Sequence, residues 1–208
     1  EGNDFSTAYM QLVYEVGELF KKHEYLMESP VLNAEEKKKF DDIRYGRAGK
    51  IEVMRSLQIL SEFLSKYYNK SVILLIDEYD VPMARATSNG YYKEMLEIMK
   101  GFMQALKDNQ CIKLAVITGC LKIAKESIFT GTNNFVSNTI TSFRLNEYYG
   151  FVQNEVDRIL EDAEIKGKGE VMKKWYDGYH FGDVDVYCPW DVMCYVDDLQ
   201  KNPNAKPD

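Results

Sequence analysis

The sequence has 208 residues, 45% of them hydrophobic and 28% charged, which suits one globular domain with a small appendage and excludes a disordered chain. A net charge of −7 argues against a broad basic surface, so we expect no strong nucleic-acid binding by this segment. No apolar run reaches the ~20 residues that cross a bilayer, so we expect no membrane partner. Four cysteines without a C-x-x-C pair, and no signal peptide, predict a cytoplasmic protein; Cys111 and Cys120 are expected to be buried free thiols.

The first third of the chain is predicted to be helical. Apolar residues recur at helical spacing over residues 5–20, and the Ser29-Pro30 pair is expected to end that segment. A short helix is predicted over 33–39 with Asn33 as its cap, and a third over 51–67.

The pattern changes at Val72–Ile76, where five aliphatic residues in a row predict a strand buried on both faces, as in parallel sheets. A helical stripe over 92–106 and a second apolar run at Ile112–Ile117 follow. Strand, helix and strand in this order predict a βαβ unit with two parallel strands.

The last part of the chain has weaker signals. We predict a short strand at 136–141, helices at 151–163 and 170–176, a hairpin at 179–187, and a final helix from Pro189 to about residue 199. The expected domains are an α/β core over 1–145, which contains both strands, and a small helical and hairpin lid over 146–208.

The residues that could carry chemistry follow the two strands. An aliphatic strand ending in Asp77-Glu78 is the Walker B pattern of many P-loop ATPases, in which the Asp holds Mg²⁺ and the Glu polarises the attacking water. A solvated acidic turn after a buried strand would look the same. Thr118 occupies the position of a polar sensor residue that contacts phosphate or water, although a Thr that caps a turn is an equal alternative.

A phosphate-binding loop is missing. Such a loop requires G-x-x-x-x-G-K-[ST], whereas the nearest segment, Gly46-Arg47-Ala48-Gly49-Lys50, is too short, lacks the hydroxyl and follows no buried strand. We therefore reject it. The sequence opens without an initiator methionine and stops in a polar stretch, so we expect it to be a fragment of a longer protein.

Several longer motifs, taken in order, resemble the bacterial and archaeal AAA-ATPase-like family. They are LIDEYDVP at 75–82, NGYY at 89–92, ITG at 117–119, IAKESIFTGTNN at 123–134, WYDGYHFG at 175–182, and YCPW at 187–190, where family members more often have Asn in place of Cys188. The resemblance extends over nearly the whole chain.

This resemblance implies an α/β fold, namely part of a P-loop NTPase (ASCE, AAA-like) with a parallel sheet and flanking helices. It assigns Asp77 to Mg²⁺ and the nucleotide, Glu78 to catalysis, and Thr118 to catalysis and nucleotide contact. It implies ATP and Mg²⁺ as cofactors, bound only together with a Walker A segment upstream of Glu1, and a PD-(D/E)XK-type nuclease domain downstream as a second partner. Whether Lys122 or Lys125 touches phosphate stays open. Trp175, Trp190 and their aromatic neighbours are expected to pack together rather than to stack on bases.

The leading hypothesis is therefore a portion of an ATP-hydrolysing domain, inactive by itself, that supplies the metal-binding and water-activating groups. The alternative is a non-catalytic regulatory or protein-binding domain derived from an ATPase. In either case, loss of the strand expected beside Ile112–Ile117 would expose apolar surface and favour self-association.

Overall fold

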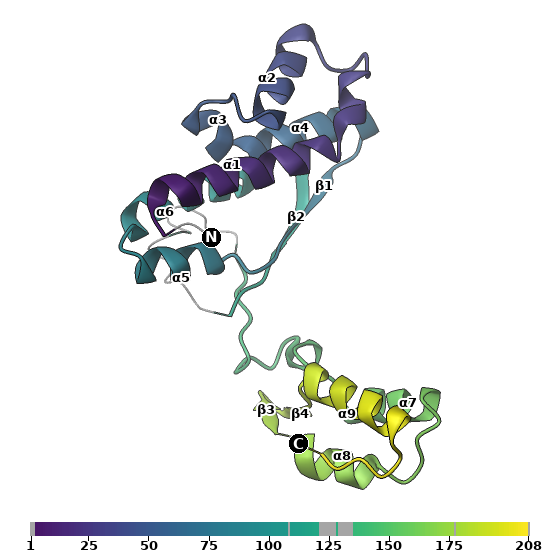
Figure 1. Ribbon diagram of the computed structural model, residues 1–208. Coiled ribbons are helices and arrows are strands. Elements are labelled where there is room, and N and C mark those ends of the chain that lie inside the picture. The colour runs from purple at the N-terminus through teal and green to yellow at the C-terminus, as the bar shows by residue number, and fades with distance from the viewer. Residues whose placement is uncertain (1–2, 108, 121–127, 129–134, 177, 208) are drawn as a thin grey trace. The chain divides into compact units, whose positions relative to one another are not determined.

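The computed structural model describes residues 3–107, 109–120, 128, 135–176 and 178–207 (Figure 1). The chain divides into two compact units, Glu1–Asn133 and Asn134–Asp208. The functional division after residue 145 stays a prediction. Each unit has its own core of buried apolar side chains and is described by itself below.

The helices of unit 1 begin where the sequence offers caps. Asp4 accepts a hydrogen bond from the backbone N–H of Thr7 (3.0 Å), and Asn33 forms a capping box with Glu36. The helical elements are α1 (Phe5–Lys21), the 3₁₀ turn η1 (Glu24–Met27), α2 (Ala34–Arg44), α3 (Lys50–Met54), α4 (Ser56–Tyr68), α5 (Val81–Ser88), α6 (Tyr92–Met103) and η2 (Gln104–Leu106).

Two expectations about these helices need correction, and one helix was not predicted. The first helix ends at Lys21, before the 3₁₀ turn, rather than at the Ser29-Pro30 pair. The helix predicted over 51–67 is broken at Arg55, whose backbone (φ −98°, ψ 6°) is not helical. The sequence reading also missed α5, because only Met83 and Ala86 of this eight-residue helix are buried and so short a stripe gives little periodicity.

The core of unit 1 is formed by side chains of its helices. Phe20 and Phe40 are fully buried with ring centroids 5.0 Å apart, and Phe63 lies 6.5 Å from Phe40. Met83 and Ile98 extend the same core toward α5 and α6, and Ile76 and Ile117 from the two strands pack against it. The strands are thus attached to the helical layer by one set of side chains.

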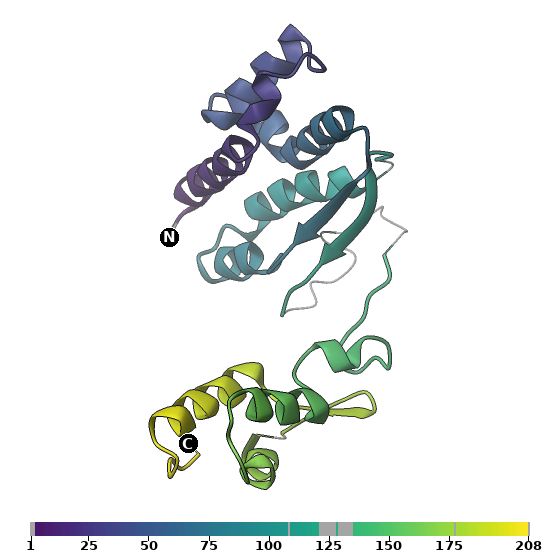
Figure 2. The ribbon, with the colours of Figure 1, turned by 90° about the vertical axis from the view of Figure 1, so that its right-hand side faces the viewer.

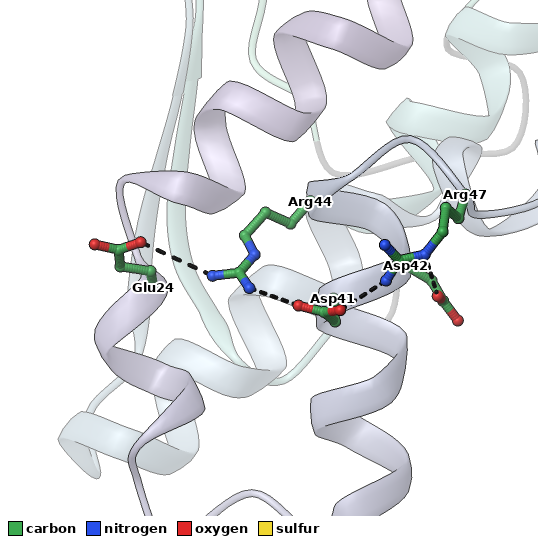
Figure 3. A network of polar contacts seen from close by, with 5 residues as sticks. All are labelled: Glu24, Asp41, Asp42, Arg44 and Arg47. Carbon is green, nitrogen blue, oxygen red and sulfur yellow. Dashed lines mark hydrogen bonds and ion pairs between the residues drawn. The ribbon is translucent and has the colours of Figure 1, made fainter.

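A network of polar contacts joins the end of α2 to its surroundings (Figure 3). Arg44 lies 2.6 Å from Asp41 and 3.8 Å from Glu24 of η1, while Arg47 reaches Asp41 at 2.6 Å and Asp42 at 3.1 Å. Burial acts to raise the pKa of Asp41, but the hydrogen bonds from the two guanidinium groups outweigh it, and the pKa is lowered. The network therefore stabilises the folded chain more at neutral pH than at acidic pH.

The two strands of unit 1, β1 (Val72–Ile76) and β2 (Ile112–Ile117), form a parallel pair, as the strand–helix–strand order predicts. Ile73 pairs with Leu114 and Leu75 with Val116, after a bulge that leaves Lys113 as the extra residue. The bulge matters because it brings the aliphatic side chains of both strands to the same face.

The expectation that these strands are buried on both faces is wrong. Burial alternates along β1, and Ile73 (58%), Leu75 (72%), Leu114 (52%) and Val116 (44%) are exposed. We call these four side chains the uncovered face. Figures 1 and 2 show the described helices of unit 1 on one side of the strands, so among the described residues only the opposite face is covered. Cys111 is half-buried and Cys120 exposed, which corrects the expectation of buried thiols.

Unit 2 contains η3 (Asn146–Tyr148), α7 (Gln153–Asp162), α8 (Gly169–Tyr176), a hairpin of β3 (Tyr179–Phe181) and β4 (Val184–Val186), and α9 (Pro189–Lys201). The predicted helices and hairpin are confirmed. The strand predicted at 136–141 is wrong: Ser142 N donates to Thr139 O (2.8 Å), and this turn replaces a strand. Trp175 and Trp190 are 55% and 76% exposed, so they do not form the expected packing cluster.

Candidate functional site

The candidate site lies where the two parallel strands end. The register pairs Ile76 with Ile117, so Asp77 and Thr118 are the next residues on each strand. The ladder continues past the strands, because Thr118 N donates to Ile76 O (2.9 Å) and Tyr79 N donates to Thr118 O (3.1 Å). Ligands in open α/β folds bind at this edge, outside the carboxyl ends of the strands.

The structure brings two of the three predicted site residues together. Thr118 Oγ1 donates a hydrogen bond to Asp77 Oδ1, which also accepts one from the backbone N–H of Glu78 (3.0 Å). Both side chains are exposed, and side-chain alternation places them on the same side of the sheet as the uncovered face. An exposed, fixed carboxylate and hydroxyl therefore stand at the end of an apolar surface.

Glu78, the third predicted residue, occupies an unusual backbone conformation. Its φ of 51° lies in the left-handed region, which a non-glycine residue enters at a cost of roughly 1–3 kcal/mol. The left-handed turn changes the chain direction directly after Asp77 and leads into α5. Glu78 is exposed, which is compatible with a role in contacting water or a ligand.

The oxygen atoms present suit a hard cation such as Mg²⁺. Asp77 Oδ2 takes part in neither of the two hydrogen bonds that Oδ1 accepts, and the Thr118 hydroxyl lies beside it. Within the described residues no three His, Cys, Asp or Glu side chains converge as a metal site. One carboxylate still fits Mg²⁺, which keeps several waters and takes further ligands from phosphate. Asp77 is therefore suitable as one ligand of Mg²⁺, and the other ligands would have to come from water and phosphate.

Two further residues complete the surroundings of the site. Asp80, immediately before α5, is 3% exposed, and Gly119 follows Thr118. A Cβ at Gly119 would lie 2.4 Å from Asp80 Oδ1 and 2.7 Å from the Tyr79 ring, closer than real Cβ atoms come to their neighbours. In the sequence, Asp80 lies within the LIDEYDVP motif and Gly119 within the ITG motif, but neither was assigned to the site; the small residue directly after Thr118 was the available signal.

The structure describes the rejected glycine segment but not the two lysines that the sequence analysis left open. Lys122 and Lys125 lie outside the described residues. The segment from Gly46 to Lys50 connects α2 to α3, and its lysine pairs with Glu97 (2.9 Å) while Arg47 pairs with two aspartates. Because its cationic side chains are paired with carboxylates, this segment does not resemble a phosphate-binding loop.

The chain is similar to a known protein family and to a longer protein of known sequence. The AAA-ATPase-like family, described as predicted AAA-ATPase, matches residues 3–129, a range that includes Asp77, Glu78 and Thr118. An "Uncharacterized protein in vnfD 5'region" of Azotobacter chroococcum mcd 1 is 28% identical over 125 residues, which is 59% of this chain and 24% of the relative. The chain thus spans about a quarter of the length of that relative. No solved structure matches.

In the described part of the chain, every helix is too short or too polar to span a membrane. The family match covers more than half of the residues and contains the parallel strands with the acidic and hydroxyl groups at their ends. The chain therefore belongs to the AAA-ATPase-like family.

Proposed function

We propose that this chain is the acidic half of an ATP-hydrolysing site, and that a phosphate-binding loop supplied by another part of the same protein completes it. The observation that carries the proposal is the hydrogen bond from Thr118 to Asp77 across two parallel strands, with Glu78 as the next residue. An acid, a hydroxyl and a second acid at one sheet edge are the groups that ATP hydrolysis needs on its metal and water side.

Each residue has a distinct role in this proposal. Asp77 would hold a water of the Mg²⁺ shell or the ion itself, and Mg²⁺ when bound would offset the charge of the β- and γ-phosphates. Glu78 would accept a hydrogen bond from the attacking water and orient it. Thr118 donates its hydroxyl hydrogen to Asp77. It would thereby hold that carboxylate in place, and its oxygen would accept a hydrogen bond from the attacking water.

The uncovered face supports the second half of the proposal. Ile73, Leu75, Leu114 and Val116 form a small apolar surface that leads to Asp77 and Thr118. Four side chains are far fewer than the ~20–30 residues per side of a stable interface between separate proteins, but they suit a strand or helix of the same polypeptide. We propose that the segment bearing the phosphate loop covers this face and so places its cationic and N–H groups above the acids.

Substitution of Glu78 in the protein that contains the phosphate loop tests the enzymatic role. Glu78→Gln should leave Mg-ATP binding intact and lower turnover by at least ~100-fold, because the amide cannot take a proton from water. Asp77→Ala should instead weaken the Mg²⁺-dependent part of binding. Glu161→Gln, on an exposed position of α7, is the matched control. Normal hydrolysis by the Glu78 variant would refute the proposal.

The 208-residue chain by itself provides the complementary test. Calorimetric titration with Mg-ATP should show no micromolar binding, because most phosphate affinity comes from loop N–H groups and a lysine. Sedimentation should show self-association, which Leu75→Lys reduces by placing a charge on the uncovered face. Micromolar binding would mean that the phosphate site lies within this chain.

A second candidate, a non-catalytic docking domain, is favoured by the same uncovered face. In that case the segment that covers the face would lack a phosphate loop, and neither the wild-type protein nor its Glu78→Gln variant would turn over ATP. A nuclease domain after this chain, as the family resemblance suggests, would fit either function and is likewise a proposal.

A further inference from the structure

Asp80 is a buried carboxylate to which the roles above assign no function. It is 3% exposed and stands directly before α5, where its backbone carbonyl accepts hydrogen bonds from Met83 N (3.0 Å) and Ala84 N (2.9 Å). Carboxyl side chains are rarely this buried, so the residues packed against Asp80 are informative.

One side of Asp80 is packed against the chain that follows β2. Gly119 leaves no room for a side chain beside Asp80 and Tyr79, since an added Cβ would fall 2.4 Å from Asp80 Oδ1 and 2.7 Å from two carbons of the Tyr79 ring. Contacts below 3.0 Å essentially never occur for real Cβ atoms, so an alanine at position 119 would force the Asp80 carboxylate or the Tyr79 ring to move.

The turn that follows β1 also contacts the end of β2 through its backbone. Tyr79 N donates to Thr118 O (3.1 Å), and the left-handed backbone of Glu78 brings Tyr79 and Asp80 back toward β2 after the chain has passed Asp77. Thr118 is therefore fixed on one side by a backbone hydrogen bond and, through its neighbour Gly119, by close packing.

We propose that Tyr79, Asp80 and Gly119 form a clamp that sets the position of Thr118 relative to Asp77. In this clamp Asp80 is a positioning residue, which acts by shape through Gly119 and does not bind the metal itself. The functional part of this inference rests on the proposed ATPase function; the physical contact does not. A loosened clamp would allow the Thr118 hydroxyl to leave Asp77 Oδ1, and the carboxylate would lose its fixed orientation.

The contact is tested in the 208-residue chain, without nucleotide. Gly119→Ala should lower the melting temperature and reduce hydrogen-exchange protection of the Tyr79 and Thr118 amides by roughly tenfold or more. Gly169→Ala is the matched control, because a Cβ there meets nothing within 4 Å. Asp80→Ala should cost less in the Gly119→Ala background than in the wild type, since it vacates the space that the new methyl group needs. Additive effects would overturn the clamp.

The positioning role is tested in the protein that contains the phosphate loop, by the Mg²⁺ concentration at half-maximal ATP binding. Asp80→Ala should raise this midpoint by roughly tenfold, as expected for a residue that supports a metal ligand, and leave metal-free nucleotide affinity unchanged. Asp80→Asn, which keeps the shape, should restore the wild-type midpoint.

The possible results separate the hypotheses. If Asp80→Asn shifts the midpoint as much as Asp80→Ala does, the charge of Asp80 matters rather than its shape, and the positioning role is wrong. If Asp80→Ala lowers stability without moving the midpoint, Asp80 is only structural and the role is again wrong. If the wild-type protein binds no Mg-ATP, the proposed ATPase function fails, while the mutant cycle in the 208-residue chain still decides whether the clamp exists.

Discussion

The two faces of the β1–β2 sheet are built from the same kinds of residue but have different surroundings. On one face Ile76 and Ile117 pack against the helical core, whereas on the other Ile73, Leu75, Leu114 and Val116 remain 44–72% exposed. Both faces are aliphatic, so composition does not distinguish them. The difference shows that the strands carry a sequence suited to two covering layers, of which the described residues provide one.

The residues of the candidate site are divided between the two faces in the same way. Asp77 and Thr118 stand on the uncovered side, at the carboxyl ends of the strands, while Asp80 and Tyr79 are partly or fully buried next to Gly119. The groups that would meet a ligand therefore face the open side, and the groups that hold them are turned toward the protein. This arrangement is what a site shared with another segment requires.

The largest expected effect comes from the same substitution made once on each face. Ile76→Ala should lower the free energy of unfolding by about 2 kcal/mol more than Ile73→Ala, because it removes atoms from the core while Ile73 is mostly in water. Both variants lose the same strand propensity, so each serves as the control for the other. Urea denaturation measures the difference, and equal losses would mean that both faces are covered in solution.

An intermediate effect is expected at Glu78. Glu78→Gly should stabilise the 208-residue chain by about 1 kcal/mol, because glycine adopts the left-handed conformation without the strain that Glu78 bears. Glu78→Gln keeps the strain and should leave stability unchanged. Thermal denaturation of both variants provides the measurement. A destabilised glycine variant would show that the Glu78 side chain holds the turn in place rather than bearing strain for the sake of a functional role.

The smallest effect is expected for an ion pair between α2 and α4, whose contribution to stability depends on pH. The hydrogen bond from Lys66 of α4 lowers the pKa of Glu36 in α2 below its ordinary value of 4.5. The pair therefore contributes stability above that pH, and the contribution is lost as the pH falls through the lowered value.

Glu36→Gln should accordingly cost about 0.5 kcal/mol at pH 7 and less at pH 3, because the pair is partly exposed. Glu35→Gln, its exposed neighbour, is the control. Unfolding curves at the two pH values would contradict the assignment if the cost of Glu36→Gln did not change with pH.

Local patterns predicted much of this fold. Helical spacing, the Asn33 cap and the two aliphatic runs predicted most elements, and strand–helix–strand order predicted the parallel pairing of β1 with β2. They failed where a short element depends on its neighbours. The 136–141 segment has strand-like residues but forms a turn through Ser142 and Thr139, and α5 has too few buried residues to give a period.

For the site, the sequence by itself predicted which residues would carry the chemistry and determined that they follow the two strands. An aliphatic strand that ends in Asp77-Glu78, with Thr118 after the next one, follows from residue types and their order, because parallel strands end at the same edge of a sheet. Only the tertiary structure decided that Thr118 donates to Asp77 and that Glu78 is left-handed. It also decided that Asp80 meets Gly119 and that one sheet face stays uncovered. These features depend on the bulge at Lys113 and on close contacts between segments about 40 residues apart, for which local residue patterns provide no information.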